Sequence, residues 1–150
     1  MGKIKNWEKK MKKHNTEMDY NIEMDENRLI IDAKRPVELH FKSNSLRFGE
    51  LKIVDHHVIE CCEHVHVSWN EANSYFESYP DVQALIIEQV VNYGLKVVAL
   101  SGLELVTVDI PAYNEQNGYY SADLALLVTN KEGKILAKWD IADTTQDVEV

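Results

Sequence analysis

Side chains that can bind a metal ion gather in residues 51–69, LKIVDHHVIECCEHVHVSW. This stretch holds four of the six histidines and both cysteines of the 150-residue chain. In a β-strand, side chains two positions apart lie on the same face, roughly 6.5–7 Å from each other. Even-numbered positions therefore share one face, on which Glu60, Cys62, His64 and His66 line up, with His56 further back.

This face supports two interpretations. The imidazoles of His64 and His66 are spaced to converge on one zinc-type ion, with Cys62 or Glu60 as a third ligand. An open coordination position would then hold a water molecule for hydrolysis, which makes a metal-dependent hydrolase or a metal-binding protein one hypothesis. The other interpretation is an ordinary polar, solvent-facing side of a half-buried strand. A bulge near residues 61–63 would also move Cys62 away from the histidines.

The segment His64-Val65-His66, followed by Glu71, resembles the first metal-binding motif of cupins. The resemblance covers eight residues and would imply a metal held by these side chains. The two glycines that flank the motif in cupins have no counterpart here, and no second cupin motif follows. The S-x-x-E pattern that begins at Ser68 also fits a capping box that starts a helix. We therefore assign no family from this motif.

The elements before this stretch are predicted to be strands. Residues 29–33 and 37–41 show β-type patterns, with Lys34-Arg35-Pro36 as a turn between them. Residues 51–69 follow as one long central strand, so the first half of the chain predicts an antiparallel meander.

The pattern changes to a helical period after Ser68. Apolar residues recur at helical spacing in residues 69–79 and again in residues 81–93, with Pro80 between them and Gly94 as the predicted helix stop. Residues 95–100 and 103–110 are predicted strands, and residues 119–129 and 134–141 form a predicted hairpin around 130–133. The predicted fold class is α+β, with a mainly antiparallel sheet of about six to eight strands packed against two consecutive helices.

Charge divides the chain into two parts. Residues 1–13 hold six lysines and one glutamate, a net charge of +5, so the remainder carries −14 against −9 for the whole chain. We predict a basic N-terminal arm or short helix over residues 1–15, which includes Trp7, and a single α+β domain over residues 16–150.

These features favour one class of function. An acidic body argues against nucleic acid, and the apolar runs are too short to span a membrane. The adjacent Cys61 and Cys62 give no disulfide framework, so we expect a cytoplasmic protein. The leading hypothesis is an inhibitor-like or immunity-like protein without catalytic activity or cofactor, which binds a protein partner of basic character. Zinc belongs only to the alternative hypothesis, and a homodimer is compatible with both.

Overall fold

The computed structural model describes residues 13–17, 19–57, 65–72, 77–115, 124–141 and 144–148. These residues form twelve strands and one 3-10 helix, and no α-helix occurs among them. The strands are β1 (Lys13–Glu17), β2 (Tyr20–Met24), β3 (Arg28–Phe41), β4 (Leu46–Phe48), β5 (Leu51–His57), β6 (Val65–Val67), β7 (Ser78–Val90), β8 (Gly94–Ser101), β9 (Glu104–Asn114), β10 (Leu124–Thr129), β11 (Ile135–Asp140) and β12 (Gln146–Asp147), and the 3-10 helix is η1 (Trp69–Glu71).

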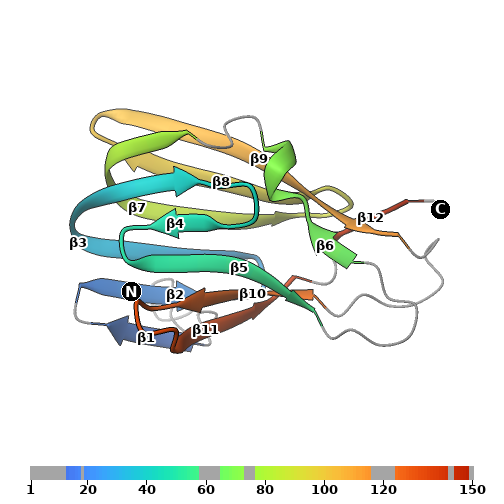
Figure 1. Cartoon of the computed structure of the whole chain (residues 1–150), viewed down its shortest axis with the longest axis horizontal. Helices are drawn as coiled ribbons and strands as arrows, with labels where there is room; N and C mark the ends of the chain where they lie inside the picture. Colours follow the sequence, from blue (N-terminus) through green and yellow to red (C-terminus); the bar gives the residue numbers. More distant parts are fainter. Residues whose placement is uncertain are drawn as a thin grey trace, which may run out of the picture.

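The strands form one sheet, nine of them in the order β11-β10-β5-β4-β3-β7-β8-β9-β12, while β1 pairs with β2, β2 pairs with β3 and β6 pairs with β9. Every pairing is antiparallel except the short parallel contact of β12 with β9. Figure 1 shows β3 and β7 each turning back on themselves at one end of the molecule, which folds the sheet over its own inner face. β3 pairs with two different strands along its length: residues 29–33 pair with β2, and residues 39–41 pair with β4. The predicted turn at residues 34–36 is an irregularity within this single long strand.

The core lies between the inner faces of the folded sheet. Burial alternates along several strands, as in β2, where Tyr20, Ile22 and Met24 point inward. A side chain of β11 also contacts the segment between β2 and β3. The indole of Trp139 on β11 donates to the backbone oxygen of Asp25 at 2.7 Å, next to the turn between β2 and β3. Among the described residues, strands supply most of the core, and Trp69 of η1 joins them.

The prediction of an α+β fold with two helices is wrong. In place of the first predicted helix, the described residues contain only the single-turn η1. Residues 78–90, which cover nearly all of the second, form the thirteen-residue strand β7. The physical reason is that β7 is apolar on both faces: Leu85 and Ile87 point into the core, while Ile86 between them lies on the outer face. A run of apolar residues on two faces of a strand cannot be distinguished from a broad helical stripe by spacing alone.

The predicted central strand over residues 51–69 is also wrong as a single element. β5 pairs with β4 and β10, whereas β6 pairs with β9 at another part of the sheet. Asp55 on β5 links the two strands, because its carboxylate accepts hydrogen bonds from the Val67 amide at 3.1 Å and from the Trp69 indole at 2.8 Å. This carboxylate holds β6 and η1 in place beside β9.

Gly94, the predicted helix stop, begins strand β8. Its φ of +151° lies outside the range that other residues adopt readily, and an added Cβ would come within 2.2 Å of the Ile110 carbonyl oxygen. Glycine is required here because the β7–β8 turn approaches the backbone of β9 so closely.

Candidate interaction surface

The predicted metal ligands are only partly within the described residues. His66 lies on β6, whereas Glu60, Cys62 and His64 fall outside the described part of the chain. Among the described residues, no three His, Cys, Asp or Glu side chains are grouped so that they could hold a metal ion. The zinc hypothesis therefore remains a prediction, and we next consider what surrounds His66.

His66 belongs to a cluster that we call the tyrosine corner, made of His66, Glu71, Tyr93 and Tyr113. His66 is paired in register with Tyr113 on β9, and their ring centroids are 5.7 Å apart. The Glu71 carboxylate accepts hydrogen bonds from the side chains of Ser68 and Tyr113. These bonds, in that order, and the nearby His66 lower the pKa of Glu71, so this carboxylate is held in its charged form.

The tyrosines of the corner keep their protons. The hydrogen bond to Glu71 raises the pKa of Tyr113. Partial burial raises the pKa of Tyr93, and the negative charges of Asp109 and Glu71 add to this effect. The corner thus combines two neutral phenol rings with two nearby carboxylates. Such a site attracts a cation through both charge and the faces of the rings.

The outer face of β3, β7, β8 and β9 carries a second feature, which we call the apolar stripe. Strand register brings apolar side chains into two neighbouring rows that cross these strands. The rows are Ile30, Ile86 and Val98, and next to them Ala84, Leu100 and Leu105. Leu105 is 72% exposed and Leu100 is 41% exposed, and the other four are half-buried. The stripe ends at β2, where Asn21 and Glu23 are the outward side chains.

A row of charged residues separates the apolar stripe from the tyrosine corner. Arg28, Glu88, Lys96 and Asp109 are cross-strand neighbours in that order, so positive and negative side chains alternate across β3, β7, β8 and β9. The outer face therefore passes from apolar, through alternating charge, to aromatic and acidic along the direction of β9.

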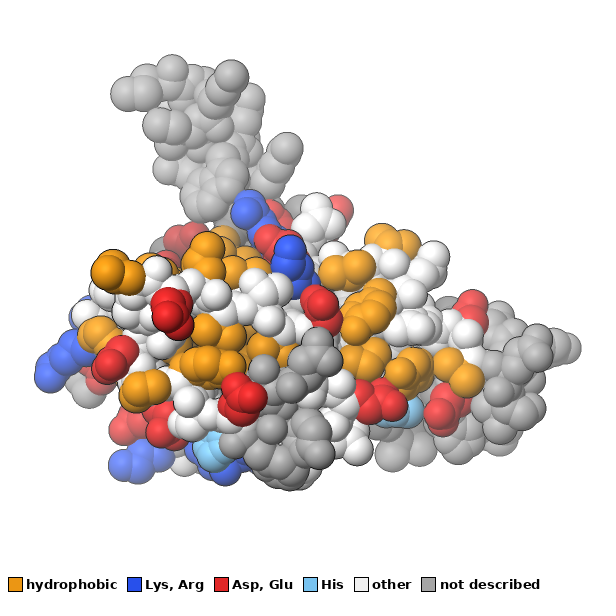
Figure 2. Space-filling view, turned by 90° about the horizontal axis from the view of Figure 1, so that it is seen from above, with side chains coloured by type: hydrophobic (Ala, Val, Ile, Leu, Met, Phe, Trp, Pro, Cys, Tyr) orange, Lys and Arg blue, Asp and Glu red, His pale blue; other side chains and the backbone are white. Residues whose placement is uncertain are grey.

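The hairpin between β8 and β9 extends the apolar surface at its tip. Leu103 is fully exposed there, beside the glycine turn at Gly102. Figure 2 shows hydrophobic side chains grouped on the side of the molecule that β9 occupies, with acidic side chains around them and few basic ones. An acidic rim around exposed leucines is unusual for a surface that only has to remain soluble.

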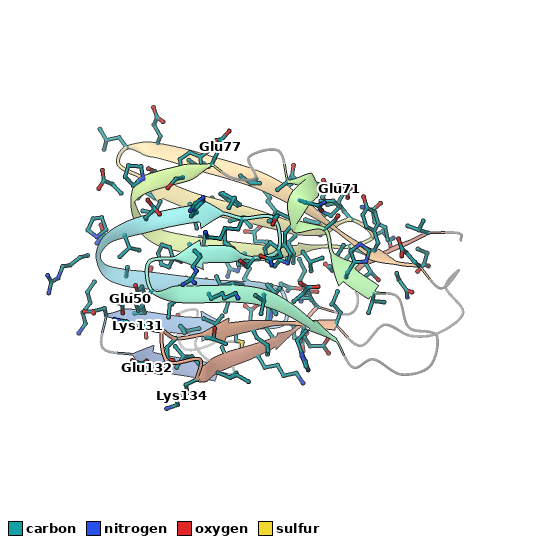
Figure 3. All side chains as sticks on the ribbon, in the orientation of Figure 1. Glu50, Glu71, Glu77, Lys131, Glu132 and Lys134 are labelled. Carbon is teal, nitrogen blue, oxygen red and sulfur yellow. The ribbon has the colours of Figure 1, made fainter. Side chains whose placement is uncertain are left out.

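A shallow groove of about 320 Å³, lined by both polar and apolar residues, lies at another place on the surface. Asp19, Tyr20, Arg35 and Glu50 contribute its polar lining, and a smaller hollow of about 120 Å³ continues it toward Lys131 and Glu132 in the β10–β11 turn. Figure 3 shows Glu50, Lys131 and Glu132 at the end of the molecule opposite Glu71. The Tyr20 hydroxyl accepts a hydrogen bond from the Glu50 amide at 3.0 Å, so it is occupied in stabilising the turn. Acidic and basic side chains are mixed in this groove, which favours no one ligand.

Sequence reasoning missed most of this surface. Tyr93 was assigned to a helix, and the predicted strand over residues 103–110 ended before Tyr113. One signal was present: odd-numbered residues from Leu105 to Tyr113 alternate with the buried Val108, Ile110 and Ala112.

Comparison with known proteins gives no function for this chain, so its function has to be argued from the geometry of the surface. No family model, curated protein or solved structure matches the chain. Among the described residues, no helix has the length and apolar character needed to cross a membrane.

Proposed function

We propose that this chain is a small acidic cytoplasmic protein that binds a protein partner and performs no catalysis, in the manner of inhibitor or immunity proteins. The apolar stripe carries this proposal. The exposed face of an antiparallel sheet is ordinarily polar, while the face toward the core is apolar. Here the outer faces of β7 and β8 carry the apolar residues Ala84, Ile86, Val98 and Leu100 side by side, and a contiguous apolar patch with a polar rim is typical of a protein interaction site.

The charge around the stripe favours a basic partner. The whole chain carries −9, and Asp32, Glu104 and Asp109 are exposed beside the stripe or at its end. Lys96 is the basic side chain nearest to them on β8, and it is half-buried between Glu88 and Asp109. Carboxylates placed at the rim of an apolar contact accelerate association with a positively charged partner and orient it.

The experiment uses the full chain as bait in an extract of the organism that encodes it, at low and high salt. The test variant replaces Ile86 and Val98 by threonine, which keeps a β-branched residue on each strand but makes the stripe polar. The matched control is Ile135→Thr, the same change at a residue that is 56% exposed on β11, outside the stripe. Circular dichroism and thermal unfolding establish that all three proteins are folded.

We expect one partner to be retained by the wild-type chain and by the Ile135→Thr control, and lost by the double variant. High salt should weaken retention, because it screens the carboxylates at the rim. Equal retention by the double variant and the control would refute the stripe as the binding surface.

A further inference from the structure

β9 has an unpaired edge within the described part of the chain. Residues 104–110 pair with β8 on one side and with no described strand on the other, whereas the end of β9 is flanked by both β6 and β12. In a strand, the backbone groups of successive residues point to opposite sides. The Ala112 amide donates to Tyr93 on the β8 side, and the Pro111 carbonyl accepts from Ser68 on the other side.

This alternation fixes which groups are available. Even-numbered residues of β9 bond toward β8, so Leu105, Thr107 and Asp109 direct their amides and carbonyls toward the unpaired edge. All three residues are exposed. Three donors and three acceptors in a straight row form a template for another strand.

We propose that the β9 edge binds an extended, basic segment of a partner protein by strand addition, and that a lysine or arginine of this segment enters the tyrosine corner. This inference rests on the proposed function and specifies how the partner is bound. An added strand would lie about 4.8 Å from β9 and would continue its cross-strand rows. An apolar side chain would then lie beside Leu105 at one end of the added strand, and a basic one beside Asp109 toward the other.

The tyrosine corner lies where such a strand must end. Ser68 already bonds to Pro111 at this edge, so β6 and η1 block any continuation of the added strand. Glu71 follows three residues after Ser68, and Figure 3 shows it on η1 beside β9. The last basic side chain of the segment would therefore meet the charged Glu71 carboxylate and the rings of Tyr93 and Tyr113. An ammonium or guanidinium group is stabilised by both.

The negative charge of the chain favours a basic segment of a partner protein over a second copy of the chain at the β9 edge. Pairing of β9 with β9 of another copy would bring together two chains of −9 each, with their Asp109 side chains at the same edge. A basic segment instead gains from the same carboxylates. Self-association is therefore an outcome that the test must measure.

The probes are acetylated and amidated heptapeptides. Their sequences are Leu-Thr-Val-Thr-Lys-Thr-Lys and its reverse, which allow parallel and antiparallel addition, and a control in which glutamate replaces lysine. Each is also made with N-methyl groups on either of the two alternating sets of residues. Only one set can direct its amides toward β9, so strand addition predicts that methylating this set weakens binding at least tenfold. Methylating the other set should change binding less than threefold.

The full chain is titrated with each peptide by nuclear magnetic resonance and calorimetry. We expect a lysine peptide to bind, the glutamate peptide not to bind, and the amides of Leu105, Thr107 and Asp109 to exchange more slowly in the complex. Glu71→Gln should weaken the lysine peptide about five- to tenfold. Glu132→Gln, the same change at the far end of the molecule, should leave binding unchanged.

The outcomes separate this inference from the proposed function. Equal binding by both methylated sets, or no binding of any peptide at 1 mM in about tenfold excess over protein, overturns strand addition and leaves the Ile86/Val98 test of the stripe standing. In the converse result, methylating one set of peptide amides weakens binding more than methylating the other, but the Ile86/Val98 variant still retains the partner. This result would support strand addition at the β9 edge and refute the stripe as the binding surface. A dimer in sedimentation that the peptides do not dissociate would assign the edge to a second copy and would overturn the inference.

Discussion

Replacing Asp55 by alanine should destabilise the protein by about 2–4 kcal/mol. Its two carboxylate oxygens accept from the Val67 amide at 3.1 Å and from the Trp69 indole at 2.8 Å. A hydrogen bond to a charged group contributes about 1.5–3 kcal/mol, and the half-exposed position of Asp55 allows water to replace part of this. Asparagine keeps one acceptor oxygen, so we expect Asp55→Asn to cost about half as much as Asp55→Ala.

Urea unfolding followed by tryptophan fluorescence measures these differences in the free energy of unfolding. A double-mutant cycle with Trp69→Phe isolates the indole bond, and we expect a coupling of about 1–2 kcal/mol between the two positions. Loss of the Asp55 carboxylate should also release β6, so the resonances of His66 and Tyr113 should shift together. A cost below about 0.5 kcal/mol for Asp55→Ala, with no coupling in the cycle, would refute the role of this carboxylate in positioning the tyrosine corner.

Three further predictions address the backbone, the outer face and the metal hypothesis. Gly94→Ala should cost about 2–4 kcal/mol, whereas Gly102→Ala, which also has positive φ but no atom within 4 Å of an added Cβ, should cost about 1 kcal/mol in the same urea assay. Asp32 is exposed as a residue, but desolvation of its carboxyl group and the charge of Glu23 raise its pKa. The folded state therefore favours the protonated form, and its stability falls as pH rises past the ordinary value of 3.8. Asp32→Asn should therefore stabilise the protein at pH 7 by up to about 0.5 kcal/mol and give no gain at pH 3; a gain that is equal at both pH values would contradict this. For the zinc alternative, elemental analysis of the full chain should find one zinc ion per chain that is lost in His66→Ala, and a wild-type chain without bound zinc would end it.

Most strands could be predicted because their inner and outer faces differ in polarity. Residues 37–41 alternate strictly, and the β10–β11 hairpin is signalled by the polar turn that contains Gly133 at a φ of +83°. Strand order could not be predicted. β3 bends and pairs with β2 and β4 along different parts of one edge, and no local pattern encodes this division.

Only those features of the candidate site that depend on one strand, such as the face on which a residue lies, could be predicted from the sequence. The predicted alternation, which placed His66 on one face of a strand, agrees with β6, where His66 is half-buried between the buried Val65 and Val67. Glu71 lies five residues from His66 in the sequence, but Tyr113 comes from β9, tens of residues along the chain. Only the long-range register brings Tyr113 opposite His66, and spacing within one strand carries no information about that register.

The error in predicting β7 and the evidence for a binding surface have the same cause. Ala84 and Ile86 fill outer positions that an isolated solvated sheet would give to polar residues, and these two residues turn an alternating pattern into an apparent helical one. Apolar residues on the outer face of a sheet lower the solubility of a protein. Departures of this kind from the usual pattern concentrate at functional sites. The net charge of −9 works against this loss of solubility, because like charges repel one another when two copies of the chain approach. Apolar side chains on the outer face, and a β9 edge that pairs with no described strand over residues 104–110, therefore support the proposal of a partner of opposite charge.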